Sequence, residues 1–288
     1  MVEARQELAD SRDSGTVVKR HRLSTRLWHW GNVVVLFIML MSGLMIFNAH
    51  PRLYWGQYGA NPDHAWLEIG SGRNGGGSRA GFLRIGDATI ETTGILGLSR
   101  DGRGQLSAIA FPGWATIPST YDLALSRRWH LTFAWFFALG IVIYLLISLA
   151  NRHLWRDIVP AARELGPRSL WETVKHHAML RFPGGEEARH YNVLQKLSYF
   201  AVLVLFIPIM VLTGLTMSPA MDATWPWLLD MFGGRQSARS IHFIVAALLV
   251  VFIVVHLLMV VLAGPVNEIR SMITGRYRLP KEKGRCAS

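Results

Sequence analysis

Cysteine and charged residues are the two scarce features of this chain, the first throughout and the second in long stretches. The single cysteine among 288 residues is Cys286, which excludes an intramolecular disulfide. It also excludes a thioether-bound haem, which needs a C-x-x-C-H motif, and an iron–sulfur cluster held by four cysteines. Any redox centre must therefore be held by other side chains.

Four windows contain no Lys, Arg, Asp or Glu: 27–51, 129–151, 197–221 and 240–267. Each exceeds the ~20 residues with which a helix spans a bilayer core. Soluble proteins rarely bury even one such uncharged helix, so four together predict an integral membrane protein. We expect the first window to remain in the mature chain, because a polar tail precedes it and its apolar run is too long for a cleaved signal.

The basic residues predict the orientation of these helices, because Lys and Arg favour cytoplasmic segments. If the N-terminus is cytoplasmic, the inner segments 1–26, 152–196 and 268–288 hold 20 of the 30 Lys and Arg residues, including all five lysines. The outer segments hold the other 10. We therefore expect a multi-pass membrane protein with both termini in the cytoplasm. The formal charge of +11 follows this topology, so nucleic-acid binding is not expected.

The predicted fold class is an all-α integral membrane protein, a four-transmembrane-helix bundle with a long periplasmic loop between helices 1 and 2. Within that loop, we expect a flexible Gly-rich stretch over 71–81 and a small β-hairpin over 82–99. The expected organisation is a disordered cytoplasmic tail over 1–20, a four-helix domain over 21–270 and a basic tail over 271–288, with helices about 24–48, 122–150, 190–217 and 237–263 and a periplasmic insert over 52–121.

Histidines interrupt three of the apolar helices. His242 and His256 are fourteen residues apart in the last one, so they lie about 40° apart on one helix face and about 21 Å apart along the axis. An ionisable residue inside a membrane indicates a functional site, although a helix–helix hydrogen bond is the simpler alternative. Because helix directions alternate, His29 lies level with His256 at the inner side, and His130 lies level with His242 at the outer side.

Two imidazoles that face each other from adjacent helices are suited to be the axial ligands of a haem iron. Two nitrogen ligands do not complete a tetrahedral zinc site, and a proton relay would normally include an intramembrane Asp or Glu, which these windows lack. Arg26 and Arg127 each precede a histidine by one turn and are candidates to bind the propionates, with snorkelling at a helix end as the alternative. Further cationic candidates are Arg22, Arg128 and Arg239.

His50 is an alternative to His130 as the outer ligand, because it follows the outer end of the first helix. The remaining histidines lie in tails or loops, where we expect solvent contact. They are His21, His64, His153, His176, His177 and His190.

The sequence resembles a known family, the bacterial four-helix di-haem cytochrome b subunits of hydrogenases and formate dehydrogenases. The motifs R-L-W-H-W, R-R-W-H and the two histidines fourteen apart match that family's ligand pattern. The thiosulfate reductase cytochrome b branch is similar over nearly the whole chain from about residue 20. Its matching strings are MSGLMIFNAHPRLYWG, YNVLQKLSY, LTGLTMSP, WPWLLDMFGGRQSARSIHF and GPVNEIRSMITGRY.

The resemblance implies two b haems, held by His29 with His256 and by His130 with His242. It also implies an exchangeable quinone near the inner haem, with Asn192 and Gln195 lining its pocket, although Asn192 is equally a polar residue at a helix start. The implied partner is a periplasmic oxidoreductase, molybdopterin-containing as in the thiosulfate reductase type. The long segment 52–128 departs from the short loop of the hydrogenase relatives, which leaves the docking partner open.

Together these features predict an electron-transfer subunit that carries electrons between membrane quinone and the periplasmic partner. It would break no bonds itself, apart from a quinol or quinone step. The alternatives are a membrane transporter, or a pure membrane anchor, with structural histidines.

Overall fold

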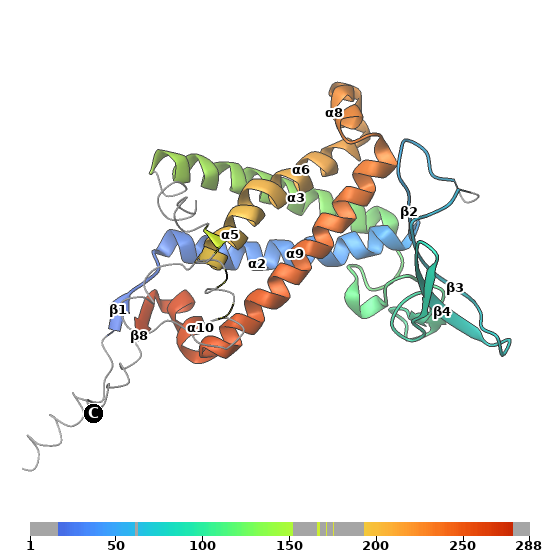
Figure 1. Ribbon diagram of the computed structural model, residues 1–288, viewed down its shortest axis with the longest axis horizontal. Helices are drawn as coiled ribbons and strands as arrows, with labels where there is room; N and C mark the ends of the chain where they lie inside the picture. Colours follow the sequence, from blue (N-terminus) through green and yellow to red (C-terminus); the bar gives the residue numbers. More distant parts are fainter. Residues whose placement is uncertain are drawn as a thin grey trace, which may run out of the picture. The chain divides into compact units, whose positions relative to one another are not determined.

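The computed structural model describes residues 17–60, 63–151, 166–167, 171, 175 and 193–278. Within them, four helices are long and apolar enough to cross a membrane, which confirms a helical, multi-pass membrane-type protein (Figure 1). They are α2 (Leu23–Asn48), α3 (Leu123–Ala150), the continuous helix Val193–Thr216, and α9 (Arg235–Ala263). The middle of each helix contains no charged residue, so it can cross the apolar core of a bilayer.

The third of these helices changes its winding along its length. It consists of α5 (Val193–Phe200), a π-helical turn η5 (Ala201–Phe206) and α6 (Ile207–Thr216). Pro208 lies two residues after the π turn and has no backbone N–H to donate to the carbonyl of Val204, four residues earlier. The wider turn relieves the clash between the proline ring and that carbonyl.

The chain divides into two compact units, which are described separately. One unit consists of residues 32–146 and 203–249, and the other of residues 1–31, 147–202 and 250–288.

The unit 32–146 with 203–249 contains an antiparallel sheet in the order β2-β3-β4-β5 (Figure 1). Its strands are β2 (Arg52–Leu53), β3 (Leu67–Arg73), β4 (Arg79–Ile85) and β5 (Ala88–Glu91). The all-α prediction is therefore wrong for this segment, and the stretch predicted as a flexible loop over 71–81 contains the β3–β4 hairpin. Gly86, at φ 56°, permits the tight turn between β4 and β5. The hairpin expected over 82–99 corresponds to β4 and β5.

The sheet packs on the ends of two long helices. Leu53, Leu67 and Ile69 are buried with Phe47 of α2 and Ala110, and Phe243 of α9 packs against them. Hydrogen bonds fix this contact, since Trp66 Nε1 donates to Ser240 Oγ at 3.0 Å and Ser240 Oγ donates to the Tyr54 carbonyl at 2.5 Å. Shorter elements complete this unit: β6 (Ser99–Arg100), β7 (Leu106–Ser107), η1 (Gly113–Ala115), α7 (Pro219–Thr224) and α8 (Pro226–Met231).

The buried carboxylate of Glu68 links β3 to both of its neighbouring strands. Glu68 on β3 is 6% exposed and forms ion pairs with Arg52 of β2, at 2.7 Å, and with Arg84 of β4. Both arginines lie directly across from Glu68 in the strand register. A buried carboxylate needs such partners, because burying an unpaired charge is costly.

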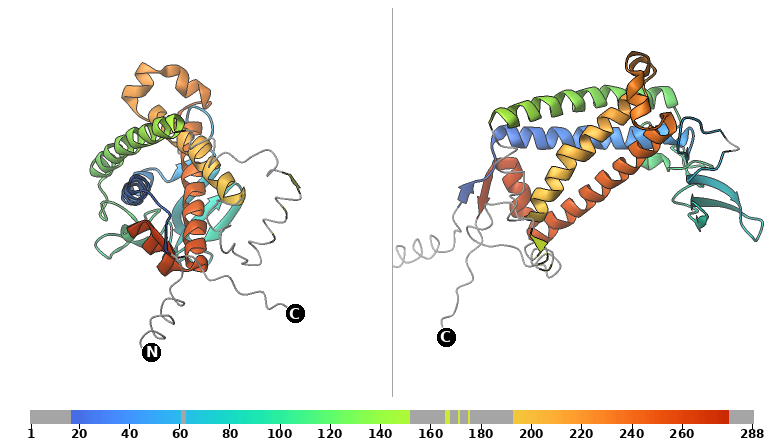
Figure 2. Two further views of the ribbon diagram at one scale, coloured as in Figure 1. Left: turned by 90° about the vertical axis from the view of Figure 1, so that its left-hand side faces the viewer. Right: turned by 45° about the horizontal axis from the view of Figure 1, so that its top comes forward.

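Two short strands pair in the unit formed by residues 1–31, 147–202 and 250–288. β1 (Val17–Lys19) pairs antiparallel with β8 (Arg276–Arg278), and α10 (Pro265–Thr274) precedes β8 (Figure 2). Arg20 lies 3.3 Å from the Glu268 carboxylate and 4.4 Å from the centroid of the Tyr277 ring. This cation links the segment before α2 to α10.

We expect Glu68→Gln to lower the free energy of unfolding by about 3 kcal/mol, because it leaves two partly buried guanidinium groups without their shared anion. Chemical unfolding in detergent, followed by tryptophan fluorescence, measures the change. The matched control Glu91→Gln, at an exposed position on β5, should change it by no more than about 0.5 kcal/mol. Equal stability of the two variants would contradict the assigned role of Glu68.

Candidate functional site

Two histidines face each other in the unit 32–146 with 203–249. His130 on α3 and His242 on α9 have ring centroids 6.4 Å apart, with ring planes inclined by 64°. We call this couple the outer pair, after its predicted depth.

The outer pair is oriented by hydroxyl groups from two other helices. Ser42 Oγ on α2 lies 3.2 Å from His130 Nδ1, and Thr213 Oγ1 on α6 lies 2.9 Å from His242 Nδ1. Each hydroxyl already donates its proton, at 2.6 Å, to the carbonyl four residues earlier in its own helix. The hydroxyl oxygens must therefore accept from Nδ1–H of the histidines.

This arrangement fixes the tautomer of both rings. His130 Nδ1 also lies 3.0 Å from the carbonyl of Met39, which can only accept a hydrogen bond. With the proton on Nδ1, Nε2 carries the lone pair that a metal requires. Within the described part of the chain, no protein group bonds to Nε2 of His130 or His242.

Glycines allow the outer pair to approach the helix backbones. A Cβ atom at Gly43 would lie 3.3 Å from His130 Cε1, and one at Gly214 would lie 3.6 Å from His242 Cε1. Each glycine directly follows the hydroxyl residue that orients the same ring. The dipeptides Ser42-Gly43 and Thr213-Gly214 thus build equivalent cradles for the two imidazoles.

A second histidine couple lies in the unit 1–31, 147–202 and 250–288. His29 on α2 and His256 on α9 have ring centroids 6.3 Å apart and ring planes inclined by 56°. Aromatic rings hold this inner pair: His256 stacks on Phe252 at 6.2 Å, and His29 meets the edge of Trp30 at 5.3 Å. His29 Nδ1 is buried and has no hydrogen-bond partner among the described residues.

The spacing of both pairs fits one metal ion between each pair of rings. An imidazole nitrogen lies about 2.0–2.1 Å from a bound transition metal and about 1.1 Å from its own ring centroid, so trans ligands place the centroids roughly 6.3 Å apart. A tetrahedral ion would bring them to roughly 5 Å. The described residues contain no group of three or more His, Cys, Asp or Glu suited to a metal. A macrocycle that supplies the other four ligands, as in haem, fits this donor set.

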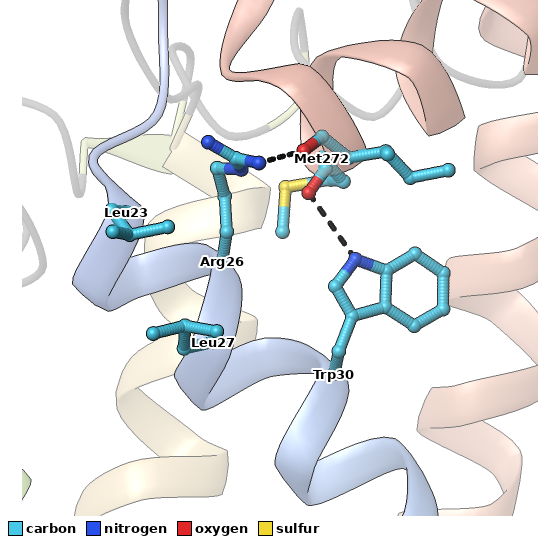
Figure 3. Close-up of a pocket in the computed structure, with 6 residues that line it drawn as sticks. Leu23, Arg26, Leu27, Trp30 and Met272 are labelled. Carbon is cyan, nitrogen blue, oxygen red and sulfur yellow. Dashed lines mark hydrogen bonds between the residues drawn. The ribbon is translucent and has the colours of Figure 1, made fainter.

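Arg26 and Arg127, the two arginines predicted to bind propionates, differ in their exposure to solvent. Arg26 donates through Nη2 to the Ile273 carbonyl near the end of α10, and its Nε is buried without a partner among the described residues. It lines an apolar groove, into which Trp30 also directs its indole, bonded at 3.2 Å to the Met272 carbonyl (Figure 3). Arg127 is exposed.

The predicted quinone residues are only partly described. Gln195 lies on α5, is partly buried and has an interaction partner. Asn192 lies outside the described residues.

His50 does not join the outer pair. Its ring stacks on Tyr54 with centroids 5.7 Å apart, while His130 is the ring opposite His242. Burial lowers the pKa of His50, and the nearby Arg239 and Arg52 guanidinium groups lower it further. His50 is therefore uncharged at neutral pH.

His21 is another histidine whose environment differs from the expected solvent contact. It is partly buried, and its pKa is lowered to about 4 by burial first and then by Arg20, His29 and Arg26. It too is neutral at physiological pH.

Sequence reasoning missed the residues that orient the outer pair. The signal was present as two similar strings, MSGL at 41–44 and LTGL at 212–215, each with a hydroxyl residue and a glycine in an apolar helix. Either string alone is unremarkable in a membrane helix, where small residues are common at helix contacts.

Comparison with known proteins adds an independent finding. A family model described as prokaryotic cytochrome b561 matches residues 20–275. A protein of Azospira oryzae, which carries the provisional name protein-methionine-sulfoxide reductase subunit YedZ1, is 31% identical over 138 residues. That match covers 47% of this chain and 64% of the relative, so the chain spans less than two thirds of the relative's length. No solved structure matches the chain.

We expect Gly43→Ala to lower the ratio of haem to protein, because its methyl group would press on His130 at an overpacking cost of about 1–3 kcal/mol. The matched control is Gly31→Ala in the same helix, where a Cβ atom meets nothing within 4 Å. The control should retain its haem and gain about 0.5–1 kcal/mol of helix stability. Absorbance of the purified variants measures the ratio, and equal ratios would refute the cradle.

Proposed function

The chain belongs to the prokaryotic cytochrome b561 family, and from this premise we propose that it carries electrons through two b haems between membrane quinone and a periplasmic oxidoreductase. Membership makes it a multi-pass membrane protein that binds haem b and transfers electrons. The number of haems, the quinone and the partner are the proposed part.

The observation that carries the two-haem proposal is the geometry of the two histidine pairs. Their centroid separations of 6.4 Å and 6.3 Å would leave room for one metal ion between the two rings of each pair. In each pair one histidine comes from α9. The other comes from α3 in the outer pair and from α2 in the inner pair. When bound, each haem iron supplies reversible one-electron chemistry.

The protein's part in the outer centre is to present two ligands in one protonation state. Ser42 and Thr213 accept the Nδ1 protons of His130 and His242, which directs both Nε2 lone pairs to the metal. Because these hydroxyls are 0% exposed, water does not compete for the hydrogen bonds. Such outer-shell bonds also raise the basicity of the ligands and so tune the potential.

The inner centre is built differently, which favours unequal potentials for the two haems. His29 and His256 are supported by the rings of Trp30 and Phe252, and His29 Nδ1 has no protein acceptor among the described residues. The quinone is proposed on this side, with Gln195 on α5 and Asn192 as hydrogen-bond donors to a carbonyl. Arg26, one turn before His29, is the proposed propionate partner of the inner haem, whereas Arg127, one turn before His130, is exposed.

The partner is proposed on the side of the sheet β2-β3-β4-β5, with both chain termini in the cytoplasm. The resemblance to thiosulfate reductase subunits suggests a molybdopterin-containing oxidoreductase. The Azospira oryzae relative, named as a protein-methionine-sulfoxide reductase subunit, suggests a different reductase as the second candidate. Both candidates leave bond chemistry on the substrate to the partner, and this chain supplies electrons.

A transporter or a pure anchor with structural histidines is the competing function. Buried histidines of that kind would bond to each other or to protein groups, whereas Nε2 of both outer ligands has no partner among the described residues. Such a protein would be colourless after purification.

We expect His242→Ala or His130→Ala to reduce the haem content from two to one per chain, and His256→Ala or His29→Ala to do the same. Pyridine haemochrome assay of purified protein measures the content. His64→Ala, at an exposed position, is the control and should retain both haems. If His50→Ala lost a haem and His130→Ala did not, the outer ligand would be reassigned; two haems in all the variants would sink the proposal.

A further inference from the structure

A cationic cluster lies one turn from the outer pair, where α9 meets the segment after α2. Arg239 precedes His242 by three residues and is partly buried. Its Nη1 donates to the Arg52 carbonyl at 2.7 Å, its Nη2 donates to the His50 carbonyl, and the guanidinium carbon lies 5.5 Å from the Phe47 ring centroid. These contacts orient the guanidinium but do not neutralise its charge.

The cluster has more positive than negative charge. Arg52, Arg84 and Arg239 contribute three guanidinium groups, and Glu68 is the one carboxylate that pairs with them in the described part of the chain. Glu68 is shared by Arg52 and Arg84, so it leaves Arg239 without an anion. Burying a cation without an anion costs free energy, so an anion beside Arg239 would stabilise this group. The imbalance is two charges, which a ligand with two carboxylates would cancel.

Two buried polar groups in the same segment have incomplete hydrogen bonding among the described residues. The Tyr54 hydroxyl interacts with the Arg52 guanidinium, whose pKa it helps to raise, but it has no acceptor among the described residues. His50 Nε2 is also buried and has no partner among them. Tyr54 is 2% exposed, and a Cβ atom at Gly59 would collide with its ring, so the ring is tightly held. A buried donor left without an acceptor costs about 1–3 kcal/mol, so this arrangement is stable only with an acceptor beside it.

We propose that Arg239, Tyr54 and His50 hold the two propionates of the outer haem. The inference rests on the proposed ligation of that haem by His130 and His242. Arg239 supplies the charge, Tyr54 supplies a hydrogen bond, and neutral His50 supplies its ring N–H in the tautomer that the propionate selects. Haem fits the cluster because it combines an apolar macrocycle for the helices with two carboxylates at one edge.

The proposal gives the outer segment a part in electron transfer. Arg239 bonds to the carbonyls of His50 and Arg52, and Arg52 begins β2 at the edge of the sheet. The backbone that orients Arg239 therefore leads directly into the sheet. A cation beside the propionates favours the reduced haem, since reduction adds negative charge.

The test compares Arg239→Gln and Tyr54→Phe with the control Arg235→Gln. Arg235 lies one turn earlier on α9, and its guanidinium is already paired with Asp222 at 2.6 Å. Haem content of the parent protein is measured first, followed by an optical redox titration and the propionate bending band in resonance Raman spectra of each purified variant.

We expect Arg239→Gln to shift the midpoint potential of one haem to more negative values and to leave the other unchanged. Tyr54→Phe should shift the same haem by less and move its propionate band, while Arg235→Gln should change neither. If Arg239→Gln does not fold, Tyr54→Phe alone decides.

Two haems with unchanged potentials and an unchanged band in Tyr54→Phe would overturn the propionate site and leave the proposed function intact. A shift of equal size in Arg235→Gln would also overturn it, because the effect would then be one of general surface charge. A parent protein without an outer haem would overturn both proposals.

Discussion

The hydrogen bond from each outer imidazole to a helix hydroxyl is the interaction on which the rest of the outer site depends. An imidazole in an apolar environment needs a partner for each nitrogen, because an unsatisfied polar group is costly there. Ser42 and Thr213 satisfy Nδ1 and so leave Nε2 to one ligand. The two adjacent glycines then let the rings approach the helices closely enough for those bonds to form. The orientation of the two rings thus depends on four small residues, Ser42, Gly43, Thr213 and Gly214.

Charge compensation is the second constraint, and it connects the membrane helices to the sheet. Glu68 pairs with arginines on both neighbouring strands, and the remaining guanidinium of Arg239 bonds to the backbone of the segment that enters the sheet. A change at Arg239 would thus affect both the start of α9 and the strand β2. The outer segment is accordingly more than a connection between two helices, because its backbone orients the Arg239 guanidinium one turn from His242.

The sequence was informative where a property is local or one-dimensional. Runs without charge longer than a bilayer crossing identified the four apolar helices, which the structure confirms. The rise per residue and the alternation of helix direction were enough to predict that His29 lies near His256 and His130 near His242. In the structure the ring centroids of the two couples lie 6.3 Å and 6.4 Å apart. The sheet was missed because strand pairing depends on contacts between distant residues, such as Arg52 with Glu68 across sixteen positions. The direction of the Arg26 side chain toward Ile273 likewise depends on where α10 folds back, which no local pattern records.

The central claim is that the chain holds two haems, each between two imidazoles. Electron paramagnetic resonance of the fully oxidised purified protein tests it most directly, because the signal reports both the number of haems and their axial ligands. The account predicts low-spin ferric signals that integrate to two centres per chain, with no high-spin component. A single low-spin centre, or a high-spin signal from a haem with one axial ligand, would contradict it.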